Sequence, residues 1–98
     1  MNNFSGDIKI NEKLNYIFKD RFDIDLFDNK KNIDINENLL GENFKLKARD
    51  LIYLLTDIEL EFKITILEED INNIKFNTIN NIINIINDKL REKKLDLS

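Results

Sequence analysis

The side chains of this sequence that could do chemistry are few in kind. Its 98 residues include no histidine and no cysteine, so the commonest general base, the commonest transition-metal ligand and the thiolate nucleophile are missing. Catalysis would have to use carboxylates, lysines, tyrosines or hydroxyls, and no closely spaced pair of acids falls in a predicted cleft. The Asp-rich segment 23–34 lacks the glycine and the regular spacing of a calcium loop. The sequence therefore predicts a protein that is not an enzyme and holds no metal or cofactor.

Three cations, Lys45, Lys47 and Arg49, lie close together where a predicted helix over residues 47–62 begins. Positive side chains at this end oppose the helix macrodipole, which favours negative charge there. One interpretation is a site that binds a phosphate, an acidic peptide or the carboxylates of a partner. The alternative is an ordinary solvated, lysine-rich surface, because the electrostatic penalty is small and salt screens it.

The same helix carries apolar residues on two sides. At about 100° per residue, the face predicted to point inward consists of Ala48, Leu51, Leu54, Leu55, Ile58 and Phe62. The face predicted to point outward consists of Arg49, Ile52, Tyr53, Thr56 and Leu60. A helix that is apolar on two sides is either buried twice or available to a partner. We expect the outward face, with Lys45 and Lys47, to bind a protein or peptide. The alternatives are that the preceding loop buries this face, or that its apolar residues are isolated exposures of the ordinary kind.

The elements that position these residues are all predicted to be helices. The expected fold class is all-α, a four-helix bundle that forms a single domain over residues 1–98. The predicted helices cover residues 6–22, 47–62, 68–74 and 78–92, and a long loop over residues 23–45 joins the first two. Ser5, and Asn77 or Thr78, are the predicted N-caps of the first and last helices. Gly41 is expected to mark unusual backbone geometry.

The apolar residues of the first and last helices form one inward stripe each. These are Ile10, Leu14, Ile17 and Phe18 in the first helix, and Ile79, Ile82, Ile83, Ile86 and Leu90 in the last. Asn15 is predicted to lie on another face of the first helix. The long loop has too many apolar residues for a free linker, which predicts that it packs over the core. The alternation Ile64-Thr65-Ile66 could be a strand, but a single short strand has nothing to pair with, and the charged tail after residue 90 is expected to fray.

Composition and charge limit the partners. The net charge of −4 argues against a general nucleic-acid binder. The first residues lack the basic start and apolar run of a signal peptide, and asparagines interrupt the longest apolar stretch, so no membrane span is expected. The predicted location is the cytoplasm. Residues 50–70 carry seven acids against one lysine, which could steer a basic partner or simply keep the surface hydrated.

Several of these features resemble the acyl carrier protein family. Members have a Leu-Gly pair, then an Asp-Ser-Leu-Asp motif that opens the second helix, acidic residues and Phe at its end, and an Ile-rich link into a short third helix. In this chain Leu40-Gly41, the stretch LKARDLIYLLTDIELEFKITILEED and the stretch FNTINNIINII follow that template. The similarity covers nearly the whole chain and is strongest from Leu39 to Ile86.

The chain departs from the family at the residue that makes a carrier. When Asp50 is aligned with the second Asp of the motif, Ala48 occupies the position of the serine that carries phosphopantetheine. A methyl group cannot form the phosphodiester, residues 44–55 contain no Ser or Thr, and the chain's only serines are Ser5 and Ser98. Among relatives, the chain is similar to the acyl-carrier-related proteins of clostridial peptide-maturation (bacteriocin-type) systems.

The resemblance implies a non-enzymatic docking or adaptor domain in peptide maturation, without a phosphopantetheine arm. Its expected partners are proteins or peptides, among them peptide-modifying enzymes, and an exposed apolar helix could also associate weakly with a copy of itself. The alternative is a genuine acyl or peptidyl carrier that is modified at a non-standard site.

Overall fold

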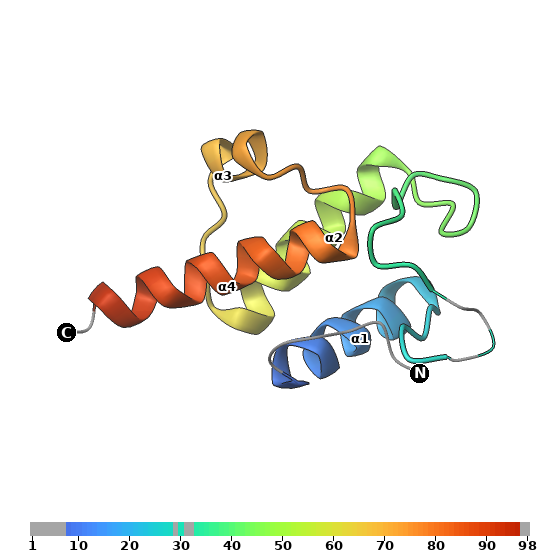
Figure 1. Cartoon of the computed structure of the whole chain (residues 1–98), viewed down its shortest axis with the longest axis horizontal. Coiled ribbons are helices and arrows are strands. Elements are labelled where there is room, and N and C mark those ends of the chain that lie inside the picture. The colour runs from blue at the N-terminus through green and yellow to red at the C-terminus, as the bar shows by residue number, and fades with distance from the viewer. Residues whose placement is uncertain (1–7, 29, 31–32, 97–98) are drawn as a thin grey trace. The chain divides into compact units, whose positions relative to one another are not determined.

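A computed structural model of the chain describes residues 8–28, 30 and 33–96, with side chains described for residues 9–28, 30 and 33–93. The described ranges form four helices: α1 (Ile8–Phe22), α2 (Ala48–Phe62), α3 (Glu68–Asn73) and α4 (Ile79–Asp96) (Figure 1). They contain no strand, so the fold class is all-α as predicted, with a long loop before α2 and a short α3. The predicted N-cap Ser5 lies outside the described residues. The chain divides into two compact units, Met1–Ile35 and Asn36–Ser98.

Helix α1 dominates the first unit. Its predicted inward stripe of Ile10, Leu14, Ile17 and Phe18 is buried, and the rings of Phe18 and Phe22 meet edge to face with centroids 5.6 Å apart. The helix ends where Asp23 takes a left-handed φ of 58°.

Asn15 is also buried, and its predicted placement on another face of α1 was wrong. Its Oδ1 accepts a hydrogen bond of 2.6 Å from the backbone N–H of Leu26, and its Nδ2 donates to Asp25 at 3.2 Å. Leu26 itself is buried, so its N–H needs a protein acceptor. Asn15 therefore fixes the beginning of the long loop to α1.

The second unit begins with the rest of the loop, which is tied to the turn before α4. The N–H of Leu39 donates to the carbonyl of Asn77 at 2.8 Å, and the N–H of Leu46 donates to the carbonyl of Leu39 at 3.1 Å. Leu39, Phe44 and Leu46 are buried. This part of the loop is thus a packed segment, as its composition predicted.

Gly41, which we expected to mark unusual backbone geometry, lies at a close approach of the backbone, and its φ is not in the left-handed region. A Cβ at this position would lie 3.0 Å from the carbonyl oxygen of Asn38, which accepts the N–H of Gly41 in a tight turn. Glycine is therefore favoured here by close approach of the backbone, since a Cβ would require the neighbouring carbonyl to shift. The left-handed residues of the described ranges outside glycine are Asp23, Lys45 and Lys63.

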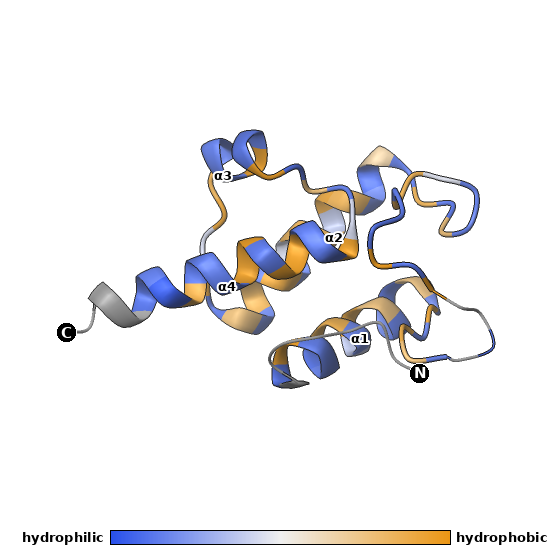
Figure 2. Cartoon of the chain, in the orientation of Figure 1, coloured by the Kyte–Doolittle hydropathy of each residue, from blue (hydrophilic) through white to orange (hydrophobic). Residues whose placement is uncertain are grey.

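Helix α4 begins at the predicted cap, because Thr78 Oγ1 accepts the N–H of Asn81 at 3.0 Å. Along its N-terminal half isoleucines alternate with hydrophilic asparagines, whereas the coloured residues that follow are mostly hydrophilic (Figure 2). The buried residues include four of the predicted stripe and also Ile85, whereas Leu90 is half-buried. The helix continues to Asp96, four residues beyond its predicted end, so the charged segment up to that residue is helical.

Candidate functional site

The candidate site is the outer face of α2, and its position depends on how this helix begins. The Oδ2 atom of Asp50 accepts the backbone N–H of Lys47 at 2.8 Å. This is half of a capping box, because a lysine side chain has no acceptor with which to complete the other half. Lys45 has a left-handed φ of 57°, and its N–H donates to the carbonyl of Gly41 at 2.8 Å. The loop and Asp50 together fix the first residue of α2.

The three predicted cations, Lys45, Lys47 and Arg49, are all exposed at this end of α2. The carboxylate of Asp50 already accepts one of the N–H groups there and offsets part of the positive charge. An external anion would have to compete with this internal one. The positive charge at this end of α2 is therefore partly compensated within the chain.

Ala48 is the first residue of α2 and is exposed, so its predicted place on the inward face was wrong. The buried residues of α2 are Leu54, Ile58 and Phe62, which follow one another at intervals of four. At 100° per residue, Ala48 points about 120° away from Leu54. Leu51 and Leu55 of the predicted inward face are half-buried.

The predicted outward face is exposed along its whole length. Its five members are Arg49, Ile52, Tyr53, Thr56 and Leu60. The exposed fractions of Ile52, Tyr53 and Leu60 are 63%, 50% and 73%, which are high values for large apolar side chains. Loop residues 36–47 of the same unit therefore do not bury this face.

Thr56 adds to the apolar character of this face. Its hydroxyl donates to the carbonyl of Ile52 at 3.2 Å, one turn earlier in the same helix. A hydroxyl that is bonded back to its own helix is less available to solvent or to a partner. The face therefore consists of the cation Arg49 followed by four residues that expose mainly carbon atoms. The phenol hydroxyl of one of these four, Tyr53, is an additional polar group.

The acidic residues of α2 lie beside this face, and Glu59 has a structural role. Its Oε2 accepts the backbone N–H of Ile66 at 2.9 Å, and its backbone carbonyl accepts the N–H groups of Lys63 and Ile64. Asp57 and Glu61 are half-buried. Glu59 therefore helps to hold the link between α2 and α3, whereas the sequence indicated only a steering or a hydrating role.

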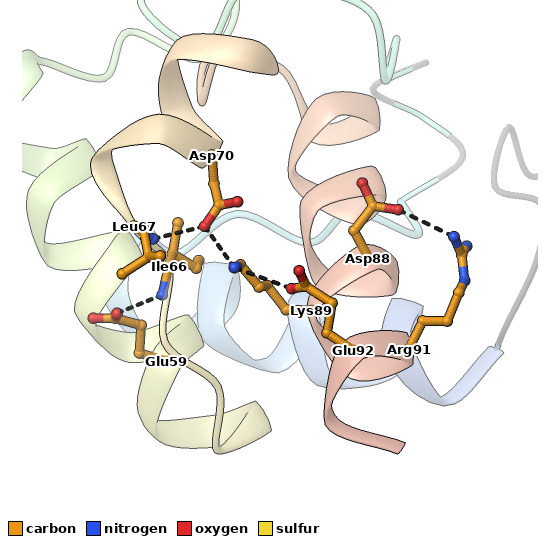
Figure 3. A network of polar contacts seen from close by, with 8 residues as sticks. All are labelled: Glu59, Ile66, Leu67, Asp70, Asp88, Lys89, Arg91 and Glu92. Atoms are coloured by element: carbon orange, nitrogen blue, oxygen red, sulfur yellow. Dashed lines mark hydrogen bonds and ion pairs between the residues drawn. The ribbon is translucent and has the colours of Figure 1, made fainter. Parts of the chain in front are cut away.

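A polar network between α3 and α4 was not foreseen from the sequence. The Nζ atom of Lys89 lies 2.8 Å from Asp70 Oδ2 and 3.1 Å from Glu92 Oε2 (Figure 3). Asp70 also accepts the backbone N–H of Leu67 at 2.7 Å, which caps α3. The residue types were visible in the sequence, but Asp70 and Lys89 are separated by 18 intervening residues, and no local pattern indicates such a pair.

The network shifts the pKa values of both partners. Burial acts to raise the pKa of Asp70, but the hydrogen bonds from Lys89 and Leu67 and the charge of Lys89 outweigh it, so the pKa lies below its ordinary value of 3.8. The hydrogen bond to Asp70 raises the pKa of Lys89 above 10.5, against the opposing effect of burial and with support from Glu92. The ion pair is therefore formed throughout the neutral range.

Within the described ranges, no three acidic residues are grouped so that they could hold a metal ion. Each helix of these ranges is too short or too polar to span a lipid bilayer. Comparison of the chain with protein-family models, with curated proteins and with solved structures finds no match.

Proposed function

We propose that this protein is a non-enzymatic docking or adaptor protein that binds protein or peptide partners through the outer face of α2. The observation that carries the proposal is the exposure of Ile52, Tyr53 and Leu60 at 63%, 50% and 73% on one side of a single helix. Apolar side chains grouped in this way mark interaction surfaces more often than isolated exposures do.

The charges around this face suggest the chemistry of the partner. Lys45, Lys47 and Arg49 are exposed at the N-terminal end of α2. A partner that is apolar at its centre and acidic at the corresponding end would match both features, since rim charges set orientation and association rate. Peptide-modifying enzymes and their precursor peptides are the partners that the acyl-carrier resemblance suggests.

The adaptor would work without a phosphopantetheine arm. Ala48 is exposed at the first position of α2, where its methyl group offers no oxygen for a phosphodiester. A domain of this kind could bring an enzyme and its substrate together by binding alone. The alternative, a carrier modified at a non-standard site, has a direct test. Incubation with a phosphopantetheinyl transferase and coenzyme A, followed by intact-mass measurement, should give no mass gain if the adaptor proposal is correct.

The docking proposal is tested by capture from the native host with the wild-type protein and with Tyr53→Glu and Leu60→Glu variants. A carboxylate placed in an apolar interface should cost about 2 kcal/mol, which is about a 30-fold loss of affinity. We expect the wild-type protein to retain peptide-modifying enzymes or precursor peptides, identified by mass spectrometry, and both variants to lose them.

Leu40→Glu is the matched control, because Leu40 is also an exposed apolar residue, at 47%, but lies in the loop rather than on α2. Circular dichroism and urea unfolding are the control measurements that test whether all three variants are folded. If Leu40→Glu reduces capture as strongly as the α2 variants do, or if the α2 variants capture normally, the outer face of α2 is not the docking surface.

A further inference from the structure

A second surface feature of the protein is a hollow of about 320 Å³ near the C-terminal end of α2. Its walls come from the link between α2 and α3 and from the last turns of α4, all within residues 36–98. The lining residues are Lys63, Ile64, Thr65, Leu67, Lys89, Glu92 and Lys93. Three of these seven are lysines, in a chain whose net charge is −4.

The cations of the hollow are not equivalent. Lys89 is already neutralised by Asp70 and Glu92, at 2.8 and 3.1 Å. Lys93 donates to the backbone carbonyl of Lys63 at 3.0 Å, and a carbonyl leaves its positive charge uncompensated. Lys63 is exposed. Lys63 and Lys93 carry two positive charges, and Lys89 with Asp70 and Glu92 carries one negative charge, so these five side chains have a net charge of +1.

Two backbone N–H groups of the link between α2 and α3 donate hydrogen bonds to carboxylates of this chain. The N–H of Ile66 bonds the carboxylate of Glu59 at 2.9 Å, and the N–H of Leu67 bonds the carboxylate of Asp70 at 2.7 Å. The N–H groups of Lys63 and Ile64 are bonded to the carbonyl of Glu59. Within the described ranges, Thr65 alone in this link has no partner for its N–H or its hydroxyl, and it lines the hollow.

The remaining walls are apolar. Leu67 is 46% exposed, and Ile64 is half-buried beside it. A volume of about 320 Å³ is too large for a bare carboxylate and has room for an attached side chain. The hollow thus combines cations and free hydrogen-bond donors with carbon surface.

From this combination we propose that the hollow binds a carboxylate attached to an apolar side chain, as found at the C-terminus of a peptide that ends in an apolar residue. The carboxylate lies between Lys63, Lys93 and the donors of Thr65, and the side chain lies against Ile64 and Leu67. This site is separate from the outer face of α2 and does not depend on its function.

The test is an NMR titration of the ¹⁵N-labelled full chain with N-acetyl-leucine, which has the free carboxylate, and with N-acetyl-leucinamide, which lacks the charge. We expect the acid to shift the amide resonances of Thr65 and its neighbours, with an affinity that falls as salt is added, and the amide to leave them unchanged. Equal shifts from the two compounds, or no shift from the acid, would overturn the proposal.

Lys63→Gly and Lys45→Gly form a matched pair of variants. Both lysines have left-handed φ values, 56° and 57°, so glycine removes one charge from each position without disturbing the backbone. Lys63→Gly should weaken binding of the acid about two- to fivefold, the range expected for one exposed ion pair, and Lys45→Gly should leave it unchanged. A similar loss in both variants would show that the acid responds to overall charge and that the hollow is not its site.

Discussion

The ion pair of Asp70 and Lys89 allows the sharpest prediction about stability. The side chains are 23% and 12% exposed, so water screens this pair less than an ordinary surface pair. Asp70 also caps α3 through Leu67 at 2.7 Å. Asp70→Ala removes the cap of α3, which contributes about 1 kcal/mol to the free energy of unfolding. It also removes the ion pair with Lys89, which contributes about 1 kcal/mol, the upper end of the range measured for exposed ion pairs. We expect a loss of about 2 kcal/mol in the free energy of unfolding.

Asp70→Asn separates the two contributions. The amide oxygen can still accept the N–H of Leu67, but the charge is gone, so the expected loss is about 1 kcal/mol. A double-mutant cycle with Lys89→Met, measured by urea unfolding at pH 7, should give a coupling free energy of about 1 kcal/mol. The matched control is the cycle of Asp88→Asn with Arg91→Met, because that pair is 3.5 Å apart and 53% and 72% exposed. It should couple by about 0.3 kcal/mol or less.

The coupling must depend on pH with a definite sign. The pKa of Asp70 is lower in the folded protein than its ordinary value of 3.8, so its contribution is complete above that value and is lost as the pH falls through the folded pKa. Lys89 has a raised pKa, so its contribution is complete below 10.5 and is lost as the pH rises through the folded pKa. A coupling that is absent at pH 7, or that persists unchanged at pH 2, would refute this account of the network.

Two shorter predictions concern the backbone. Lys63→Gly should raise the free energy of unfolding by about 0.5–1 kcal/mol in urea titrations, because glycine adopts the left-handed φ of 56° without the steric cost of a Cβ. The control is Lys19→Gly, at an exposed helical position of α1, which should lower the free energy of unfolding by a similar amount. Asn15→Ala should lower the free energy of unfolding by about 1–3 kcal/mol, because it leaves the buried N–H of Leu26 without its acceptor at 2.6 Å, and a loss below 0.5 kcal/mol would contradict that role.

Much of the fold was predictable because the helices are marked by local signals. Each predicted helix was found, and the ends that the structure describes lie within a few residues of those expected. The periodic spacing of Ile and Leu defined the buried sides, and Thr78 supplied a cap whose hydrogen bond is formed. Exposure of the α2 outer face also followed from the angles between its residues. These features depend on residues within one or two turns of each other.

The errors have different physical causes, and a distant hydrogen-bond partner explains only some of them. Asn15 was assigned outward by its type, but a buried N–H of the following loop needed an acceptor, which the spacing in α1 does not reveal. Ala48 was counted as inward because the buried stripe was continued to the first turn of α2, although the stripe runs through Leu54. The sequence does not predict the left-handed φ values of Lys45 and Lys63, because neither position is a glycine. The hollow was missed because α4 supplies one wall of it.

The structure gives a physical reason to separate the folding role of α2 from its binding role. The N-terminal end of the helix is fixed by Asp50, and its C-terminal end by the bonds of Lys63 and Ile64 to Glu59 and by Lys93. Leu54, Ile58 and Phe62 supply the buried side. None of these interactions uses Leu60, which is 73% exposed on the outer face. This is the expected arrangement if the outer face of α2 binds a partner.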